Sequence, residues 1–278
     1  MKTNSISSFD SRENATLVNI AFSAQSPLFD IIQNNNVMLQ WMRSVVQRHV
    51  EEYLKPGDTI LDINAGTGID AVHFAEKGYA VHAMDIAEGM VNEIRRKIIS
   101  KGLDDRITAE QRSFTEAGEL SPKKFDHIFS NFGGLNCVND LHQVAEQLLR
   151  VIKPNGLLTL VIMPPICPWE IAHIFRGDTT IGMRRLHNDG IIAHIEGHYF
   201  KTYYHTVSSL IKSFGDQCTV LKIRGVASFS PPPYMEKFPQ KFPGVYSFLQ
   251  SCDERFSMFR PFNRWADQFI ITMKVRDI

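Results

Sequence analysis

The sequence has few cysteines and no excess of either charge. Its four cysteines, at 137, 167, 218 and 252, are far apart and form no C-x-x-C pair, which argues against a zinc site and against a secreted disulfide framework. Thirty basic residues balance thirty acidic ones, so no overall basic surface favours nucleic acid or an anionic membrane as a partner. We therefore expect a cytoplasmic protein with no metal site and no nucleic-acid partner.

Long apolar runs are also missing. Residues 1–10 lack the apolar core of a signal peptide, and no later run approaches the roughly 18 residues of a membrane span. We therefore expect no membrane partner. The 278 residues, 44% of them hydrophobic, can bury one large core, either as a single domain or as a domain with a cap.

The most informative stretch is residues 60–70, which read ILDINAGTGID. Its first residues are apolar enough for a strand buried on both faces, and an apolar stripe at helical spacing follows from residue 71 to 75. Between them, Gly66 and Gly68 allow a ligand to approach the backbone where a Cβ would collide with it. The N–H groups of the new helix would face that ligand.

This stretch resembles the first motif of class I S-adenosylmethionine (SAM)-dependent methyltransferases, an acidic residue followed by x-G-x-G-x-G. Here it runs from Asp62 to Gly68, with Asn64 in place of the first glycine. We expect Asn64 to be accepted because asparagine tolerates a left-handed backbone. Residues 66–71 also fit G-x-G-x-x-A, the dinucleotide fingerprint, so an NAD(P)-dependent oxidoreductase is an alternative.

Asp85 closes a second predicted strand, residues 79–85, nineteen residues after Gly66. A carboxylate at that place can accept hydrogen bonds from a ribose diol in either family. It could instead cap the helix predicted from residue 87 to 100. We favour the ribose.

The fourth predicted strand decides between the two families. Residues 125–129 are followed by a polar, glycine-rich segment, residues 130–136, where ligands bind at the switch point of open α/β sheets. The whole run from 60 to 163 resembles the methyltransferases in order and spacing, whereas a dinucleotide enzyme predicts only the first turn and Asp85.

The resemblance implies a Rossmann-like doubly wound sheet of seven strands, whose last strand, residues 268–275, runs antiparallel between the fifth and sixth. We divide the chain into an N-terminal helical lid (1–54), a SAM-binding core (55–163), an inserted substrate cap (164–202) and the C-terminal part of the core sheet (203–278). Within the lid, Ser26 and Pro27 predict a break between two helices.

The predicted site follows from the same resemblance. The cofactor-binding candidates are Asn64, Ala65, Gly66, Thr67, Gly68, Asp85, Ile86, Met90, Ser113, Phe114, Asn131, Phe132 and Gly133. The substrate-lining candidates are Phe29, Asn136, Trp169 and Arg184. No catalytic residue is identified; His194 and His198 are weak candidates for a general base, and for each a surface or structural role is the simpler interpretation.

We predict an enzyme that transfers a methyl group from SAM to a small-molecule acceptor and releases S-adenosylhomocysteine. Oxygen is slightly preferred to nitrogen or sulfur as the attacked atom. Besides the oxidoreductase, a SAM-binding module without catalysis stays open. The acceptor and the oligomeric state do not follow from the sequence.

Overall fold

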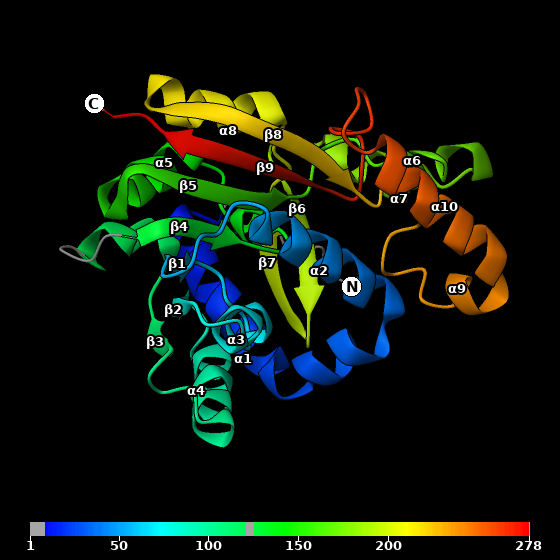
Figure 1. Cartoon of the computed structure of the whole chain (residues 1–278). Coiled ribbons are helices and arrows are strands. Elements are labelled where there is room, and N and C mark those ends of the chain that lie inside the picture. Colours follow the sequence, from blue (N-terminus) through cyan, green and yellow to red (C-terminus); the bar gives the residue numbers. More distant parts are fainter. Residues whose placement is uncertain (1–8, 121–124, 278) are drawn as a thin grey trace.

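A seven-stranded sheet lies at the centre of the computed structural model, which describes residues 9–120 and 125–277 (Figure 1). The strand order is β3-β2-β1-β4-β5-β9-β8. The strands are β1 (Thr59–Asp62), β2 (Ala80–Asp85), β3 (Ile107–Gln111), β4 (Phe125–Ser130), β5 (Ile152–Ile162), β8 (Cys218–Val226) and β9 (Gln268–Val275). Strand β9 pairs antiparallel with both β5 and β8. The predicted fold class, with an antiparallel last strand between the fifth and sixth, is confirmed.

Helices cover both faces of this sheet. One face packs on α2 (Val37–Glu51), α3 (Ile69–Glu76) and α4 (Glu88–Lys101), and the other on α5 (Leu141–Val151), α8 (Val207–Phe214) and the short 3-10 helix Phe114–Leu120. Neighbouring strand residues alternate between the two cores: Ile60 and Phe129 lie in the first, Leu61 and Ile128 in the second. Burial on both faces explains why the strands are continuously apolar.

The N-terminal segment forms one long helix, α1 (Ser11–Asn35), so the predicted break at Pro27 is wrong. Proline leaves the carbonyl of Ser23 without its helical N–H partner, but the Ser26 hydroxyl donates to that carbonyl at 2.9 Å. The break comes instead at Asn36, whose side chain accepts from the backbone N–H groups at the start of α2. Residues 1–8 of the predicted lid lie outside the described residues.

Helix α1 contacts α4 and also strand β7 (His198–Thr202). Asn14 donates to the backbone of Cys137 and Lys201, and the Ser23 hydroxyl accepts from the Gly89 N–H at 3.1 Å. By length and composition alone, α1 is the one helix among the described residues that could span a membrane. However, the hydrogen bonds of Asn14 and Ser23 show that α1 packs on the rest of the protein.

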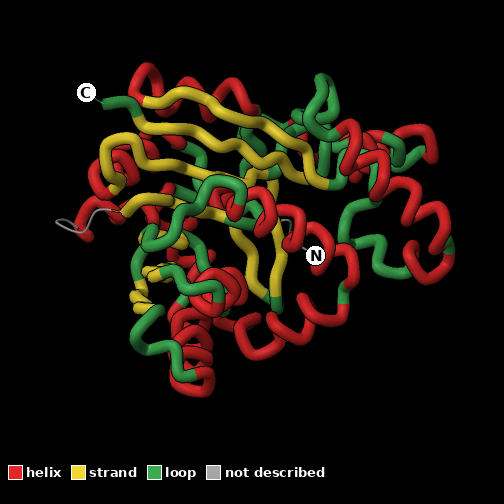
Figure 2. Tube along the Cα trace, in the orientation of Figure 1, coloured by secondary structure: helices red, strands yellow, loops and turns green. Residues whose placement is uncertain are grey.

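The predicted cap between β5 and α8 contains short helices and a hairpin. These are α6 (Pro168–Ile171), α7 (Thr179–Met183), β6 (Ile191–Ile195) and β7 (His198–Thr202), and the two strands form a separate sheet. Figure 2 shows the hairpin standing apart from the main sheet. Two later helices, α9 (Phe238–Lys241) and α10 (Pro243–Phe256), lie at the same end of the molecule as α6 and α7 (Figure 1). Trp169 of α6 packs edge-on against Phe238 of α9.

Candidate functional site

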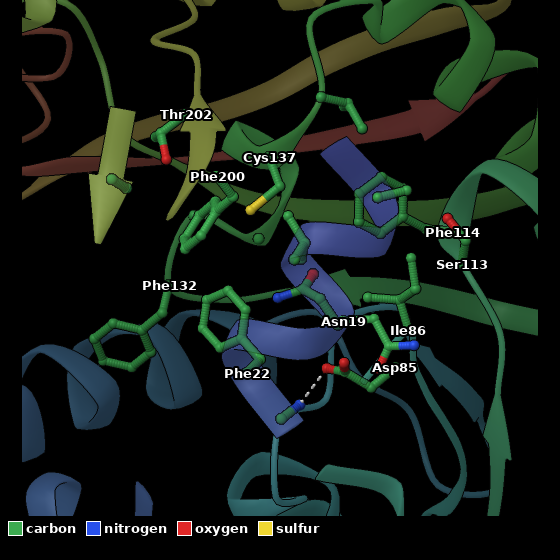
Figure 3. Close-up of a pocket in the computed structure, with 18 of the residues that line it drawn as sticks. Asn19, Phe22, Asp85, Ile86, Ser113, Phe114, Phe132, Cys137, Phe200 and Thr202 are labelled. Atoms are coloured by element: carbon green, nitrogen blue, oxygen red, sulfur yellow. Dashed lines mark hydrogen bonds between the residues drawn. The ribbon is translucent and has the colours of Figure 1, made fainter. Parts of the chain in front are cut away.

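A cavity of about 1020 Å³ lies where β1, β2 and β4 end. It is lined by residues from these strand ends, from α1 and from the predicted cap. Figure 3 shows Cys137, Phe200 and Thr202 gathered together, apart from Asp85, Ile86, Ser113 and Phe114. Its volume lies at the upper end of the roughly 300–1,000 Å³ that is usual for ligand pockets.

The glycine turn after β1 has the backbone that its sequence predicts. Gly66 and Gly68 have φ values of 55° and 78°, a region that residues with a Cβ adopt rarely. A Cβ at Gly66 would lie 3.5 Å from the ring of Phe29 on α1. The hydroxyl of the buried Thr67 bonds Asp30, and Lys97 donates to the carbonyl of Thr67 at 2.9 Å. These contacts tie the helix α1 to the turn.

Asn64 does not have the left-handed backbone that we expected. It is absent from the residues with positive φ. Instead its side chain joins β1 to the end of β4: the amide donates to the carbonyl of Asn131 at 2.7 Å and its oxygen accepts from the Ser130 hydroxyl at 2.5 Å. Asn64 is therefore kept by side-chain hydrogen bonds between the two central strands and not by a left-handed backbone.

Asp85 lies at the end of β2 and faces the glycine turn. One carboxylate oxygen accepts from the N–H of Gly66 at 2.9 Å and the other from the N–H of Ala87 at 2.8 Å. Helix α4 begins after Ala87 without a side-chain cap, so Asp85 is not its N-cap. Burial raises the pKa of Asp85 to about 6, against hydrogen bonds from the backbone N–H groups of Ala87, Gly66 and Ile86. Asp85 also lines the cavity, where its oxygens can accept from a ligand.

Two further carboxylates lie behind the turn. Burial, with the nearby Asp70 and Asp85, raises the pKa of Asp62 well above its usual range. Asp70 is ionically paired with Arg43 and accepts from the amide of Asn131 at 3.0 Å. The guanidinium carbon of Arg43 lies 4.5 Å from the ring centre of Phe132. Asn131 and Phe132 are thus held by α2 and α3.

Of the sequence-predicted residues, most line the cavity. They are Phe29, Asn64, Gly66, Asp85, Ile86, Met90, Ser113, Phe114, Asn131, Phe132, Gly133, Arg184 and His194. Phe132 and Gly133 both have positive φ, 50° and 68°, which turns the chain sharply after β4. Ala65, Thr67, Gly68, Asn136, Trp169 and His198 are not among the lining residues.

Asn136 holds the two ends of the predicted cap together. Its amide donates to the carbonyls of Met163 and Tyr203, at 3.0 and 2.6 Å, and its oxygen accepts from the Met163 N–H at 2.9 Å. The side chain is completely buried. Asn136 therefore positions the residues on either side of the segment 164–202, and it does not face the cavity as we expected of a substrate-lining residue.

Trp169 and the two histidines also differ from their predicted places. The indole N–H of Trp169 donates to the carbonyl of Phe229 at 2.7 Å, away from the cavity. His194 lines the cavity but is exposed and packs against the ring of Tyr199, 4.6 Å between centroids. His198 lies on the neighbouring strand of the hairpin, opposite Ile195. Their catalytic roles stay predictions.

Several lining residues carried no sequence signal of a site. They are Asn19 of α1, Cys137, and Phe200, Thr202 and Tyr204 around the end of β7. Phe22 and Phe200 pack with ring centroids 5.6 Å apart. Burial raises the pKa of Cys137 to about 12, so its thiol stays protonated and is no nucleophile. Only the folded chain brings α1 and the hairpin together.

A buried group of ionic residues lies beside the cavity. Ligand atoms of Cys167, Glu170 and Asp267 lie within 4.8 Å of one another, close enough to hold a metal ion. However, Glu170 pairs with Arg184 and Arg185 at 2.6 and 2.7 Å, and Asp267 pairs with Arg185 at 2.6 Å. The two arginines already neutralise both carboxylates, so we interpret the group as an ion-pair network.

Comparison with known proteins gives the class. Residues 60–156 match a family described as methyltransferase domain. Over 97% of its length the chain resembles a Burkholderia thailandensis 1,6-didemethyltoxoflavin-N1-methyltransferase, solved with S-adenosylhomocysteine, with a TM-score of 0.59, 13% identity and 92% of that chain covered. Residues 60–156 therefore resemble a methyltransferase domain, and the chain has the fold of the class I SAM-dependent methyltransferases.

Relatives of known name are similar over part of their length. A demethylmenaquinone methyltransferase of Corynebacterium glutamicum is 30% identical over 41% of this chain and 46% of its own. A ubiquinone/menaquinone biosynthesis C-methyltransferase UbiE of a Shewanella species is 31% identical over 54% of this chain and 60% of its own. The chain thus spans about half the length of the curated relatives that it matches.

The residues of the cavity suit SAM. The left-handed glycine at 66 leaves free the space that a side chain would fill, next to Phe29. Asp85 can accept from ribose hydroxyls, and Ile86, Met90 and Phe114 offer apolar surface for a base beside it. Asn64 and Asn131 also line the cavity, with their side-chain amides bonded to the end of β4 and to Asp70.

Proposed function

We propose that this protein transfers the methyl group of SAM to a small, largely apolar molecule. The proposal rests on one continuous cavity, which runs from the Asp85 carboxylate to the apolar side chains of α1 and the hairpin. A cofactor and an acceptor can therefore meet inside it. SAM supplies an activated methyl group on a sulfonium, so the chain itself needs to orient the two molecules and exclude water.

Each part of the chain has a role in this proposal. Asp85 would bind the ribose, and the turn at Gly66 would let the cofactor lie against the backbone. Helix α1 covers the cavity and, through Asp30 and Asn14, is bonded both to the glycine turn and to the hairpin. The cap residues would surround the acceptor.

Two of the names favour carbon as the attacked atom. The Shewanella relative is named a C-methyltransferase, and a similar structure is a geranyl diphosphate C-methyltransferase of Streptomyces coelicolor, with a TM-score of 0.55, 13% identity and coverage of 86% of this chain and 81% of that one. These names support transfer to carbon above the oxygen that the sequence led us to prefer. In the balanced reaction the acceptor carbon gains CH3, the electron pair of the S–CH3 bond stays on sulfur, and the acceptor releases one proton.

The test is a calorimetric titration with SAM, S-adenosylhomocysteine and NAD, followed by an acceptor screen with a labelled methyl donor. We expect binding of the two sulfur compounds and transfer of label to an apolar acceptor. Binding of NAD alone would instead support the oxidoreductase. Binding of SAM with no transfer to any acceptor, and no formation of S-adenosylhomocysteine, would support a non-catalytic module.

A further inference from the structure

The cavity around Phe22 and Cys137 has much apolar surface, and two of its polar residues, Arg184 and Tyr204, are near enough for the charge of each to affect the pKa of the other. Phe132, Met163, Ala193, Ile195 and Phe200 supply aromatic and aliphatic surface. Arg184, just after α7, and Tyr204, two residues after β7, bring the polar groups. In an apolar chamber, a few placed donors decide which ligand binds and how it is oriented.

Arg184 is held firmly and still has a free donor. Its Nε and Nη2 donate to the two oxygens of Glu170, at 2.8 and 2.6 Å, in the bidentate geometry that fixes a guanidinium. Glu170 is itself buried and fixed by Arg185. Within the described part of the chain, Nη1 of Arg184 donates to no acceptor. Arg184 is one of the residues that line the cavity.

Tyr204 supplies a second donor. The guanidinium carbon of Arg185 lies 5.3 Å from its ring centre, which fixes the ring. Burial raises the pKa of its hydroxyl, so the group stays protonated and can donate. Among residues 9–120 and 125–277, no group is hydrogen-bonded to this hydroxyl, and Tyr204 lines the cavity.

We propose that Arg184 and Tyr204 together bind an oxygen atom of an otherwise apolar acceptor. This rests on the proposed function and narrows the acceptor to an aromatic or polyene molecule with a phenolic or enolic oxygen. Because Glu170 offsets the charge of Arg184, the pair suits one hydrogen-bonded oxygen better than a diphosphate. Such an oxygen also suits carbon methylation, since once its O–H proton leaves, its electron pair makes the neighbouring carbon more nucleophilic.

The test measures the binding of 1-naphthol and of naphthalene to the protein saturated with S-adenosylhomocysteine. For the natural sequence we expect 1-naphthol to bind about tenfold more tightly, as one well-made hydrogen bond in a dry site allows. Arg184→Met and Tyr204→Phe should each reduce this preference, and the double variant should abolish it. Glu170 keeps Arg185 as its partner in Arg184→Met, so folding should survive.

Two control variants change the same residue types at other positions. Arg12→Met removes another arginine that lines the cavity, and Tyr199→Phe changes an exposed tyrosine of the hairpin; both should keep the preference for 1-naphthol. An equal affinity for both probes in the natural sequence, no binding of either, or a preference that survives in the double variant would overturn the inference. Failure to bind S-adenosylhomocysteine would instead refute the proposed function.

Discussion

At Asp85 the cavity is built from backbone turns that follow neighbouring strands, whereas around Arg184 and Tyr204 it is built from side chains of distant segments. The first region uses a glycine turn, a carboxylate at a strand end and a sharp bend at Phe132, all close to their strands. The second needs α1, the cap and the hairpin to pack on one another. A local turn can be recognised from sequence, but a chamber of distant side chains cannot.

The largest expected effect tests the first region. Gly66→Val should weaken binding of S-adenosylhomocysteine at least about 100-fold, because a β-branched residue is strained at φ 55° and would meet Phe29. Gly57→Val is the matched control, since Gly57 has φ 88° but open space around it. Thermal melting should show a similar loss of stability in both variants. Calorimetry should show lost binding in Gly66→Val alone. Unchanged affinity in Gly66→Val would place the cofactor elsewhere.

The next test concerns the second region. Asn136→Ala removes three hydrogen bonds that hold Met163 and Tyr203, and should cost about 2–3 kcal/mol of unfolding free energy. Turnover should fall more than the affinity for S-adenosylhomocysteine, because the displaced segment carries the acceptor side of the cavity. Asn263→Ala, at another buried amide, should leave turnover intact. Equal losses of turnover and cofactor affinity in Asn136→Ala would show that the two regions are not separable.

Asp85→Asn tests whether Asp85 contacts the ligand or only stabilises the fold. Asparagine keeps one acceptor oxygen where the carboxylate offers two, so either Gly66 or Ala87 loses its bond and stability should fall by about 1 kcal/mol. Affinities for S-adenosylhomocysteine and adenosine should fall about tenfold, and that for methionine should not change. A lower melting temperature with unchanged affinity would make Asp85 purely structural.

The same carboxylate predicts a pH dependence. The pKa of Asp85 is raised to about 6 in the free protein, so the group binds its proton below that pH and is ionised above it. If the ribose needs the carboxylate, affinity should rise with pH through 6 and be about tenfold weaker at pH 5 than at pH 7. Asp85→Asn should remove this slope. A slope that persists in the variant would come from another group.

The last test concerns the sheet that both regions share. Burial lowers the pKa of His49 to about 4 and that of His127 to about 3. The unfolded chain therefore binds more protons below pH 6.5, and stability should fall by up to about 1.4 kcal/mol per pH unit for each histidine as pH drops toward 4. His127→Gln can still bond Thr159 and should flatten this slope in chemical denaturation. An unchanged slope would exclude His127 as a cause.

The sequence predicted the sheet, its antiparallel last strand and the glycine turn because apolar runs and glycines act locally. Its errors came from side chains that act at a distance. Pro27 stays inside a helix because the Ser26 hydroxyl bonds the freed carbonyl, and Asn64 is kept by contacts with β4. Tyr204 and Cys137 had no local pattern, and nothing in the spacing of Asn136 showed that it joins the ends of the cap.

The most direct measurement is a crystal structure with S-adenosylhomocysteine. We predict that the two ribose hydroxyls bind the carboxylate of Asp85 and that the ligand lies against the backbone of Gly66. Its sulfur should face the space between Phe132 and Cys137. The acceptor side, lined by Phe200, would then lie open beyond the sulfur. A ligand bound outside this cavity, or one whose sulfur faces solvent, would contradict the account.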